Sequence, residues 1–267
     1  MGTENPLRRT GGLRLLVAGG GTGGHVIPAL VLAREFCRRD SSREVLFAGT
    51  RRGIEVRLVP AAGFPLELLE IGMLQGQSLA VRLQTLLALP RAFWQAGRIL
   101  DRFRPHVVLG VGGYASGPVM LAAAFRGIPL AVFEPNAYPG LANRWIAPYV
   151  ARAFVGFEEA ANCFAAGRAI ITGIPVRDEF FKVPPKKHRA PFTVLVFGGS
   201  QGARSLNRAV IEALPKLDQT QSPAKLGLTL LHQSGESEYN RVQEEVAKHS
   251  APVEVFAFLD HIWEAFA

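Results

Sequence analysis

Cysteine is scarce in this sequence of 267 residues, and that scarcity excludes a fold held together by many disulfides. The two cysteines, Cys37 and Cys163, stand far apart, which fits a reducing, cytosolic compartment. The polar segment Met1–Gly12 lacks the apolar run of a signal peptide. The six histidines are isolated from one another, so the sequence has no spacing typical of metal ligands and we expect no metal site.

Acidic residues are outnumbered by basic ones, 22 to 30, which gives a formal net charge of +8 and a pI near 10. A charge of this sign predicts anionic partners, which include nucleic acids, phosphates and lipid surfaces. No recognised nucleic-acid-binding module is present, so we expect no nucleic-acid partner.

Charged residues are absent from the nineteen positions Val107–Phe125, a length that raises the question of a membrane-spanning helix. The segment contains four glycines and Pro118, which do not suit such a helix. We interpret it as a buried strand, a glycine-rich loop and a helix.

Apolar runs alternate with helical patterns along the chain. The run Leu13–Ala18 is typical of a parallel strand that is covered on both faces, and a helical pattern follows at Pro28–Arg39. Repeated alternation of this kind predicts βαβ units, and therefore an α/β fold with parallel sheets. Further strands are predicted at 44–49, 64–71, 105–110, 128–133, 153–156, 169–173, 192–197, 227–232 and 253–256, and further helices at 55–62, 79–103, 141–146, 204–217 and 237–248.

The composition changes at 178–191, where prolines and basic residues predict a linker. We therefore expect a flexible N-terminus at 1–12, a first Rossmann-like domain at 13–177 and a second domain at 192–267. Only three strands fall in the second domain, whereas an open α/β domain usually has five or six. We expect this domain to be incomplete.

The first glycine-rich loop holds five glycines in the six positions Gly19–Gly24. Such a loop between a strand and a helix lets backbone N–H groups approach an anion. It matches the dinucleotide fingerprint G-x-G-x-x-G, but the second strand is followed by Arg51 and Arg52 instead of the acidic residue that binds a ribose. The arginines would suit a 2′-phosphate, so an NADP-dependent oxidoreductase remains an alternative, as does a loop that only packs a helix on a strand.

His25 follows this loop at the start of the predicted helix. A helix N-terminus disfavours imidazolium, and a neutral histidine can act as a general base. The alternative is a histidine that only makes hydrogen bonds to the loop.

A second loop of similar design lies at Gly198–Ala203. No Lys-Ser or Lys-Thr follows its glycines, so it is not a P-loop. Ser200 could donate to a phosphate oxygen together with backbone N–H groups. Arg177, which precedes the linker, could face a cleft between the domains or lie solvated on the surface.

Glu134 and Asn136 follow a predicted strand, at the edge where open parallel sheets bind ligands. Glu134 could be a base or could orient another group, and an ion pair with an arginine is the alternative.

The predicted long helix Leu79–Phe103 is rich in arginine and follows the apolar loop Ile71–Leu74. One interpretation is an ordinary packed helix with a solvated basic face. The other is an interfacial patch whose apolar side chains enter a membrane while its arginines meet anionic head groups.

Five motifs resemble one family, the MurG-type UDP-N-acetylglucosamine–N-acetylmuramyl-(pentapeptide) pyrophosphoryl-undecaprenol N-acetylglucosamine transferases. The motifs are Gly19–Leu30, Gly110–Pro118, Gly173–Arg177, Gly198–Ala203 and His232–Gly235. The resemblance runs in register from Leu13 to Phe266 and implies a GT-B fold, which consists of two Rossmann-like domains that face each other across a cleft.

The resemblance also implies an activity, an inverting transfer without a cofactor. N-acetylglucosamine would move from UDP to the C4 hydroxyl of the muramoyl sugar of lipid I, giving lipid II for peptidoglycan. The work would take place at the cytoplasmic face of the bacterial inner membrane, and the stretch Ile71–Phe103 matches the segment that meets this anionic surface.

The family's site residues transfer by position. Contacts with the UDP-sugar are implied for Thr22, Gly23, Gly24, Asn136, Arg177, Ser200 and Leu259. The resemblance also implies that the acceptor and catalytic side of the site is lined by His25, Tyr114 and Glu134. Phe133 stands where the family commonly has histidine, which leaves His25 and Glu134 as candidates for the base.

The chain ends before a glycine-, serine- and glutamate-bearing loop and a glutamine that hold uracil, ribose and part of the sugar in the family. We therefore expect weak nucleotide binding and little transferase activity from this chain. The alternatives are an NADP-dependent oxidoreductase and a nucleotide-sugar-binding module without catalysis.

Overall fold

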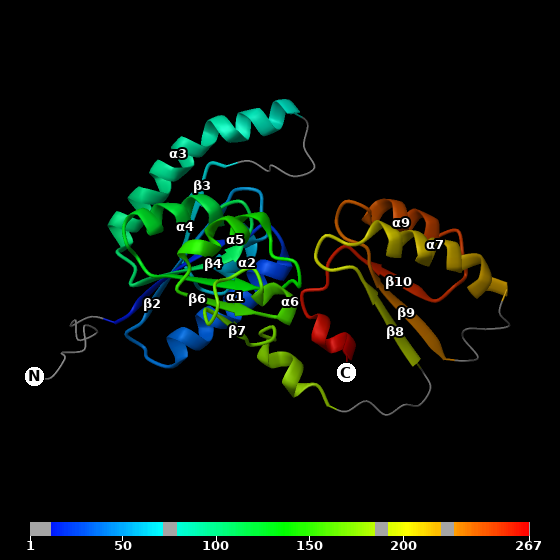
Figure 1. Cartoon of the computed structure of the whole chain (residues 1–267). Helices are drawn as coiled ribbons and strands as arrows, with labels where there is room; N and C mark the ends of the chain where they lie inside the picture. Colours follow the sequence, from blue (N-terminus) through cyan, green and yellow to red (C-terminus); the bar gives the residue numbers. More distant parts are fainter. Residues whose placement is uncertain (1–11, 72–78, 185–191, 220–226, 267) are drawn as a thin grey trace, which may run out of the picture. The chain divides into compact units, whose positions relative to one another are not determined.

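The computed structural model describes residues 12–71, 79–184, 192–219 and 227–266. The chain forms two compact units, Met1–Val176 and Arg177–Ala267. Each unit is built on its own parallel sheet (Figure 1).

The first unit contains a seven-stranded sheet in the order β3-β2-β1-β4-β5-β6-β7, and every neighbouring pair is parallel. Its strands are β1 (Arg14–Gly19), β2 (Glu44–Thr50), β3 (Leu66–Leu69), β4 (Val107–Gly112), β5 (Leu130–Glu134), β6 (Arg152–Val155) and β7 (Ala169–Ile171). The order reverses direction between β1 and β4, and such a switch point is where open α/β sheets bind ligands.

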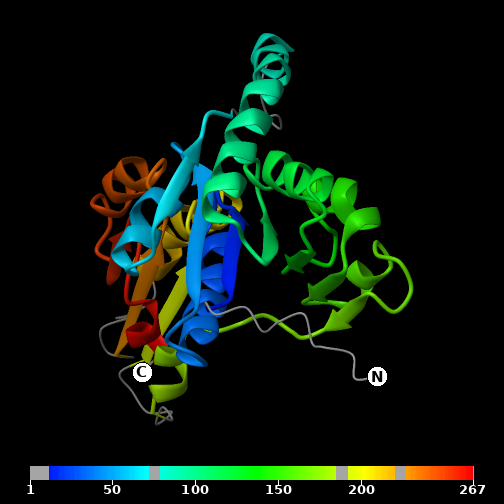
Figure 2. The same cartoon turned by 90° about the vertical axis from the view of Figure 1, so that its left-hand side faces the viewer.

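Helices cover both faces of this sheet (Figures 1 and 2). They are α1 (Gly23–Arg38), α2 (Glu55–Ala61), α3 (Leu79–Phe103), α4 (Ser116–Phe125), α5 (Leu141–Ile146), the 3-10 helix η1 (Ala147–Tyr149) and α6 (Glu158–Ala161). Leu15 and Val17 of β1 belong to the buried cluster beneath α1 and α2. Leu16 and Ala18 belong to the cluster beneath α3, α4 and α5. Because successive strand residues face opposite sides, a strand covered on both faces is apolar throughout.

The charge-free segment Val107–Phe125 forms β4, a glycine-rich turn and α4, as predicted. Among the helices in the described ranges, none is long and apolar enough to cross a membrane.

Two prolines lie inside helices of the first unit. The helical spacing identified at Pro28–Arg39 continues back to Gly23, where α1 begins within the glycine-rich segment, because Pro28 removes only the hydrogen bond to the Gly24 carbonyl while its ring is buried in the core. Pro90 lies inside α3, which is one helix of 25 residues with the predicted bounds Leu79–Phe103.

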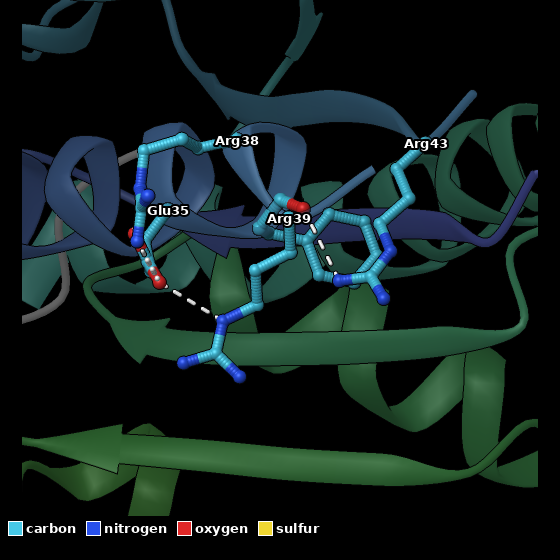
Figure 3. A network of polar contacts seen from close by, with 5 residues as sticks. Glu35, Arg38, Arg39 and Arg43 are labelled. Atoms are coloured by element: carbon cyan, nitrogen blue, oxygen red, sulfur yellow. Dashed lines mark hydrogen bonds and ion pairs between the residues drawn. The ribbon is translucent and has the colours of Figure 1, made fainter. Parts of the chain in front are cut away.

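A polar network closes the C-terminal end of α1 (Figure 3). Both Arg38 and Arg39 donate to the carboxylate of Glu35. Arg43, which precedes β2, donates to the Phe36 carbonyl over 3.2 Å and lies over the Phe36 ring. These contacts hold the turn that joins the helix to the second strand.

The second unit has a three-stranded parallel sheet in the order β10-β9-β8. Its elements are η2 (Asp178–Lys182), β8 (Phe192–Phe197), α7 (Arg204–Gln219), β9 (Leu228–Gln233), α9 (Tyr239–Val246), β10 (Val253–Phe256) and η3 (Ile262–Phe266). The start of the predicted linker, 178–182, is a 3-10 helix and not an extended segment. The reason is that Phe180 packs its ring against Trp263 and Phe266.

Candidate functional site

Two glycine-rich loops interlock at the switch point of the first sheet. The Gly20 N–H donates to the Gly112 carbonyl over 3.1 Å. A Cβ on Gly19 would lie 2.1 Å from the Gly112 oxygen, and one on Gly113 would lie 2.4 Å from the Gly20 oxygen. These glycines are therefore required because the backbone of one loop packs on the backbone of the other.

The anion held by the first loop is a side chain of the protein itself. Glu55, at the start of α2, is 1% exposed and accepts the Gly21 N–H over 2.7 Å through Oε2. Its Oε1 accepts the Thr50 N–H over 2.9 Å and the Thr50 hydroxyl over 3.1 Å. Glu55 was not predicted from the sequence, because the dinucleotide fingerprint has its acid directly after the second strand. The signal was the acidic residue at the head of the next short helix.

His25 lies in the first turn of α1 and is half-buried. Its Nδ1 is 3.3 Å from the Gly20 carbonyl oxygen and 3.3 Å from Thr22 Oγ1. A proton on Nδ1 satisfies the carbonyl and leaves Nε2 as a proton acceptor. A Cβ on Gly112 would lie 2.9 Å from that Nε2, so the imidazole packs directly over the end of β4.

The other predicted contacts of the first loop stand at the N-terminus of α1. Thr22 is the exposed N-cap residue, and its carbonyl accepts the N–H groups of His25 and Val26. Gly23 is buried and Gly24 is exposed. A Cβ on Gly24 would meet nothing closer than the Thr22 hydroxyl at 3.9 Å, and its φ is ordinary. Neither packing nor strain in the chain requires this glycine, so the space beside it is open to a ligand.

Glu134 is buried at the end of β5 and accepts four hydrogen bonds. Its Oε1 accepts the Asn136 backbone N–H over 3.0 Å and the Asn136 side-chain amide over 2.8 Å. Its Oε2 accepts the Gly140 N–H over 2.9 Å and the Asn143 side-chain amide over 3.0 Å. All four donors are amides, so neither oxygen needs an arginine partner. The arrangement suits the alternative in which Glu134 orients its neighbours.

Two further residues of this region have simple placements. Tyr114 is half-buried in the turn between β4 and α4. Phe133, which stands where the resembled family has histidine, is 1% exposed and belongs to the core beneath α1. The position therefore has a packing role in this chain.

The glycine loop of the second unit connects β8 to α7 and contains the half-buried Ser200. A Cβ on Gly202 would lie 1.8 Å from the Ser234 oxygen, and one on Gly235 would lie 2.2 Å from the Gln201 oxygen. The loop is thus seated on the turn that follows β9.

Arg177 is held by aromatic rings of the second unit. Its guanidinium lies 4.6 Å from the Trp263 ring centroid and 5.6 Å from that of Phe180. Its Nη1 donates to the Asp260 carbonyl over 3.4 Å. A half-buried arginine in these contacts is not a solvated surface residue. Leu259 lies next to Asp260 in the segment that follows β10, and its N–H donates to Gln233 Oε1.

The predicted site residues are divided between the two units. Strand ends of the first sheet, or the segments directly after them, hold Thr22, Gly23, Gly24, His25, Tyr114, Glu134 and Asn136, and the second unit holds Arg177, Ser200 and Leu259. In the described ranges, no group of three His, Cys, Asp or Glu side chains could hold a metal ion.

Large aromatic side chains are exposed on neighbouring helices of the first unit. Trp94 of α3 is 61% exposed, Phe125 of α4 is 76% exposed and Trp145 of α5 is 71% exposed. The Phe125 ring also contacts Phe93, and Arg98 lies over the Trp94 ring. The predicted loop at 72–74 lies outside the described residues.

Comparison with known proteins places both units in one family. Residues 15–155 match the glycosyltransferase family 28 N-terminal domain, and residues 193–267 match the glycosyltransferase family 28 C-terminal domain.

Named relatives are similar over nearly all of the chain. A UDP-N-acetylglucosamine–N-acetylmuramyl-(pentapeptide) pyrophosphoryl-undecaprenol N-acetylglucosamine transferase of Syntrophotalea carbinolica is 44% identical, over 96% of this chain and 70% of the relative. The enzyme of the same name from Anaeromyxobacter sp. strain K is 46% identical, over 96% of this chain and 66% of the relative. The chain thus spans about two thirds of the length of these relatives.

Solved structures share the fold. Acinetobacter baumannii MurG is 26% identical, with a TM-score of 0.62 over 95% of this chain and 68% of that one. A Neisseria meningitidis UDP-GlcNAc 2-epimerase bound to UDP-GlcNAc is 13% identical, with a TM-score of 0.60 over 95% of this chain and 74% of that one. The predicted α/β fold of two Rossmann-like parallel sheets is confirmed. These relatives give no support to the NADP-dependent oxidoreductase.

Proposed function

We propose, from the premise that the chain belongs to the MurG-type transferases of glycosyltransferase family 28, that it serves the transfer of N-acetylglucosamine from UDP to lipid I. In this reaction the C4 hydroxyl oxygen of the muramoyl sugar bonds to C1 of N-acetylglucosamine. The bond from C1 to the diphosphate oxygen breaks, and its electron pair leaves with UDP. The hydroxyl proton goes to a base, and the configuration at C1 is inverted.

One observation supports His25 as that base. Its Nδ1 faces the Gly20 carbonyl at 3.3 Å, which favours the tautomer whose Nε2 can accept a proton. The ring packs over Gly112 at the end of β4, at the switch point where open α/β sheets bind ligands and where an acceptor hydroxyl could approach. Thr22, Gly23 and Gly24 would supply the N-terminal amides of α1 to a substrate anion.

Glu134 acts in this proposal through Asn136 and not as a base. Four hydrogen bonds occupy its carboxylate, and two of them come from Asn136. The carboxylate therefore sets the direction of the Asn136 side chain, which would contact the donor sugar. Tyr114 would line the acceptor side from the adjacent strand end.

The second unit would hold the donor. Ser200 and the amides of its loop would stabilise the negative charge that grows on the leaving diphosphate. Arg177, whose guanidinium is stacked on Trp263, would add a fixed positive charge. Leu259 would contribute a further contact from the segment after β10.

A thermal-shift titration tests the substrate class. Millimolar UDP-GlcNAc should raise the melting temperature of the chain, because a ligand that binds only the folded state stabilises it by mass action. NADPH at the same concentration should leave it unchanged. If NADPH stabilises the protein and UDP-GlcNAc does not, the proposal is wrong.

Substitution at His25 separates catalysis from binding alone. In a version extended to the full length of the relatives, His25→Gln should lower the rate of lipid II formation by about 100-fold or more, since general-base catalysis contributes 10²–10⁴-fold. It should leave the UDP-GlcNAc dissociation constant within about twofold of wild type. Equal, measurable rates for the two proteins would overturn His25 as the base. UDP-GlcNAc binding without any lipid II formation, by wild type as well, would support a binding module without catalysis.

We further propose that the first unit binds the anionic cytoplasmic face of the bacterial inner membrane through Trp94, Phe125 and Trp145. Aromatic side chains of this kind favour the membrane interface, and the net charge of +8 favours anionic lipid. Sedimentation with phosphatidylglycerol vesicles should fall strongly for Trp94→Ser combined with Phe125→Ser. Phe181→Ser, at a side chain 79% exposed in the second unit, is the matched control and should bind as wild type does.

A further inference from the structure

Gln233, the last residue of β9, uses both ends of its side chain. Its Nε2 donates to the Gly199 carbonyl over 2.8 Å, and its Oε1 accepts the Leu259 N–H over 2.8 Å. The side chain is 2% exposed. A carbonyl at one end and an N–H at the other fix the orientation of the amide. Gln233 thus joins the loop after β8 to the segment after β10.

The Gly199 oxygen accepts Gln233 Nε2–H over 2.8 Å and the Gly202 N–H over 3.1 Å, and the two bonds together fix the direction of one peptide plane in the glycine loop. A trans peptide is planar, and its C=O and N–H point in opposite directions. Because the Gly199 oxygen is directed to Gln233, the N–H of Ser200 in the same peptide is directed the opposite way. The bond from the Leu259 N–H to Gln233 Oε1 fixes the peptide group between Phe258 and Leu259 in the same manner. Gln233 therefore sets both the spacing and the orientation of these two segments.

The surroundings of Gln233 make it a rigid reference point. Burial lowers the pKa of the neighbouring His232 imidazole, so the ring is neutral at pH 7 and its Nδ1–H donates to the Val196 carbonyl over 3.1 Å. Asn207 of α7 donates to the Ser234 carbonyl over 2.9 Å. The Ser234 N–H and hydroxyl both donate to the Phe256 carbonyl at the end of β10. The turn after β9 is thereby tied to α7 and to the end of β10.

We propose that Gln233 is a positioning residue of the donor site, which sets the distance between the two donor contacts at Ser200 and Leu259. The inference rests on the proposed function, since that function places UDP-GlcNAc on both segments. Gln233 touches neither substrate. Its loss raises KM for UDP-GlcNAc and leaves KM for lipid I unchanged, because no lipid I contact belongs to these segments.

Two substitutions at this position remove different bonds. Gln233→Leu fills a similar volume and removes both hydrogen bonds. Gln233→Glu keeps an acceptor for the Leu259 N–H but turns a second oxygen toward the Gly199 carbonyl. A protonated carboxyl can donate to that carbonyl, so lowering the pH restores the missing bond in Gln233→Glu alone. Gln243→Leu and Gln243→Glu, at an exposed glutamine of α9, are the matched controls.

The test combines amide hydrogen exchange with calorimetric titration of UDP-GlcNAc. Gln233→Leu should speed exchange in 198–203 and 257–260, and it should weaken binding about tenfold, the effect of one or two lost hydrogen bonds. Gln233→Glu should speed exchange in 198–203 only, and its binding should recover between pH 7 and pH 5 relative to wild type. The Gln243 variants should match wild type throughout.

The outcomes separate this inference from the proposed function. If wild-type protein binds UDP-GlcNAc and the Gln233 variants bind it equally well, the positioning role is overturned while the function stands. If wild-type protein does not bind UDP-GlcNAc, the donor assignment fails and the positioning role fails with it. Faster exchange throughout the second unit of Gln233→Leu would show general loss of structure, and the decision then rests on the pH response of Gln233→Glu.

Discussion

Glu55→Ala should destabilise the first unit strongly, although no substrate contact is assigned to Glu55. The substitution removes the Glu55 carboxylate, which is 1% exposed, and leaves the N–H groups of the half-buried Gly21 and Thr50 without their acceptor. Each buried donor left unsatisfied costs about 1–3 kcal/mol, so the free energy of unfolding should fall by about 2–6 kcal/mol. The Thr50 hydroxyl can rotate to another acceptor and is left out of this sum.

Urea unfolding read by hydrogen exchange is the appropriate assay, because it reports the two units separately. Gly21 and Thr50 should exchange faster in Glu55→Ala, and the unfolding midpoint of the first unit should fall while that of the second unit stays. Glu44→Ala, at an exposed glutamate that begins β2, is the control and should lie within about 0.5 kcal/mol of wild type. A loss below about 1 kcal/mol in Glu55→Ala would refute the reasoning, since water would then be satisfying both donors.

Three further predictions concern single contacts. Gly112→Ala should shift the imidazole NMR signals of His25 and lower lipid II formation, because φ is +91° at Gly112 and a Cβ there would lie 2.9 Å from His25 Nε2. The control is Gly117→Ala, where a Cβ meets nothing within 4 Å, and it should behave as wild type. A hydrogen bond from His249 holds the pKa of Asp218 below its ordinary value, so stability from this carboxylate is present above about pH 4 and is lost as the pH falls further. The urea midpoint of the second unit should show that loss, and Asp218→Asn should remove it. Hydrogen bonds from Arg38 and then Arg39 lower the pKa of Glu35 to about 2, and an NMR titration of Arg38→Gln should find it higher.

The sequence predicted the elements well wherever burial alone decides them. The runs at β1 and β2 are covered on both faces and are therefore apolar throughout, a pattern that predicted buried parallel strands. The bounds of α5 and β10 agree with the prediction to the residue. The helix after the first glycine-rich loop was also predicted, although its start at Gly23 falls inside the glycine run, where no side chains show a helical spacing.

The site was less predictable, because hydrogen-bond partners depend on tertiary contacts. Glu134 and Asn136 were identified from their place after a strand, but the four donors around the carboxylate include Asn143, nine residues later. Glu55 meets Gly21 across 34 positions, and Gln233 meets Gly199 across 34 positions. Spacing along the chain does not reveal pairs at that separation. The catalytic and donor-binding roles of these residues remain predictions.

The interlocked glycine loops also limit how this protein can vary. A side chain on Gly19 or Gly113 would clash with a backbone carbonyl oxygen of the other loop, and every amino acid has that atom. No substitution in the opposite loop can make room for such a side chain, because the oxygen belongs to the backbone. A mutation at one of these glycines therefore cannot be compensated by a second mutation in the other loop. Gly24 and Gly117 border open space and carry no such constraint within the chain. Mutational drift and directed evolution of substrate preference therefore have room at these helix N-termini, and little at the junction beneath them.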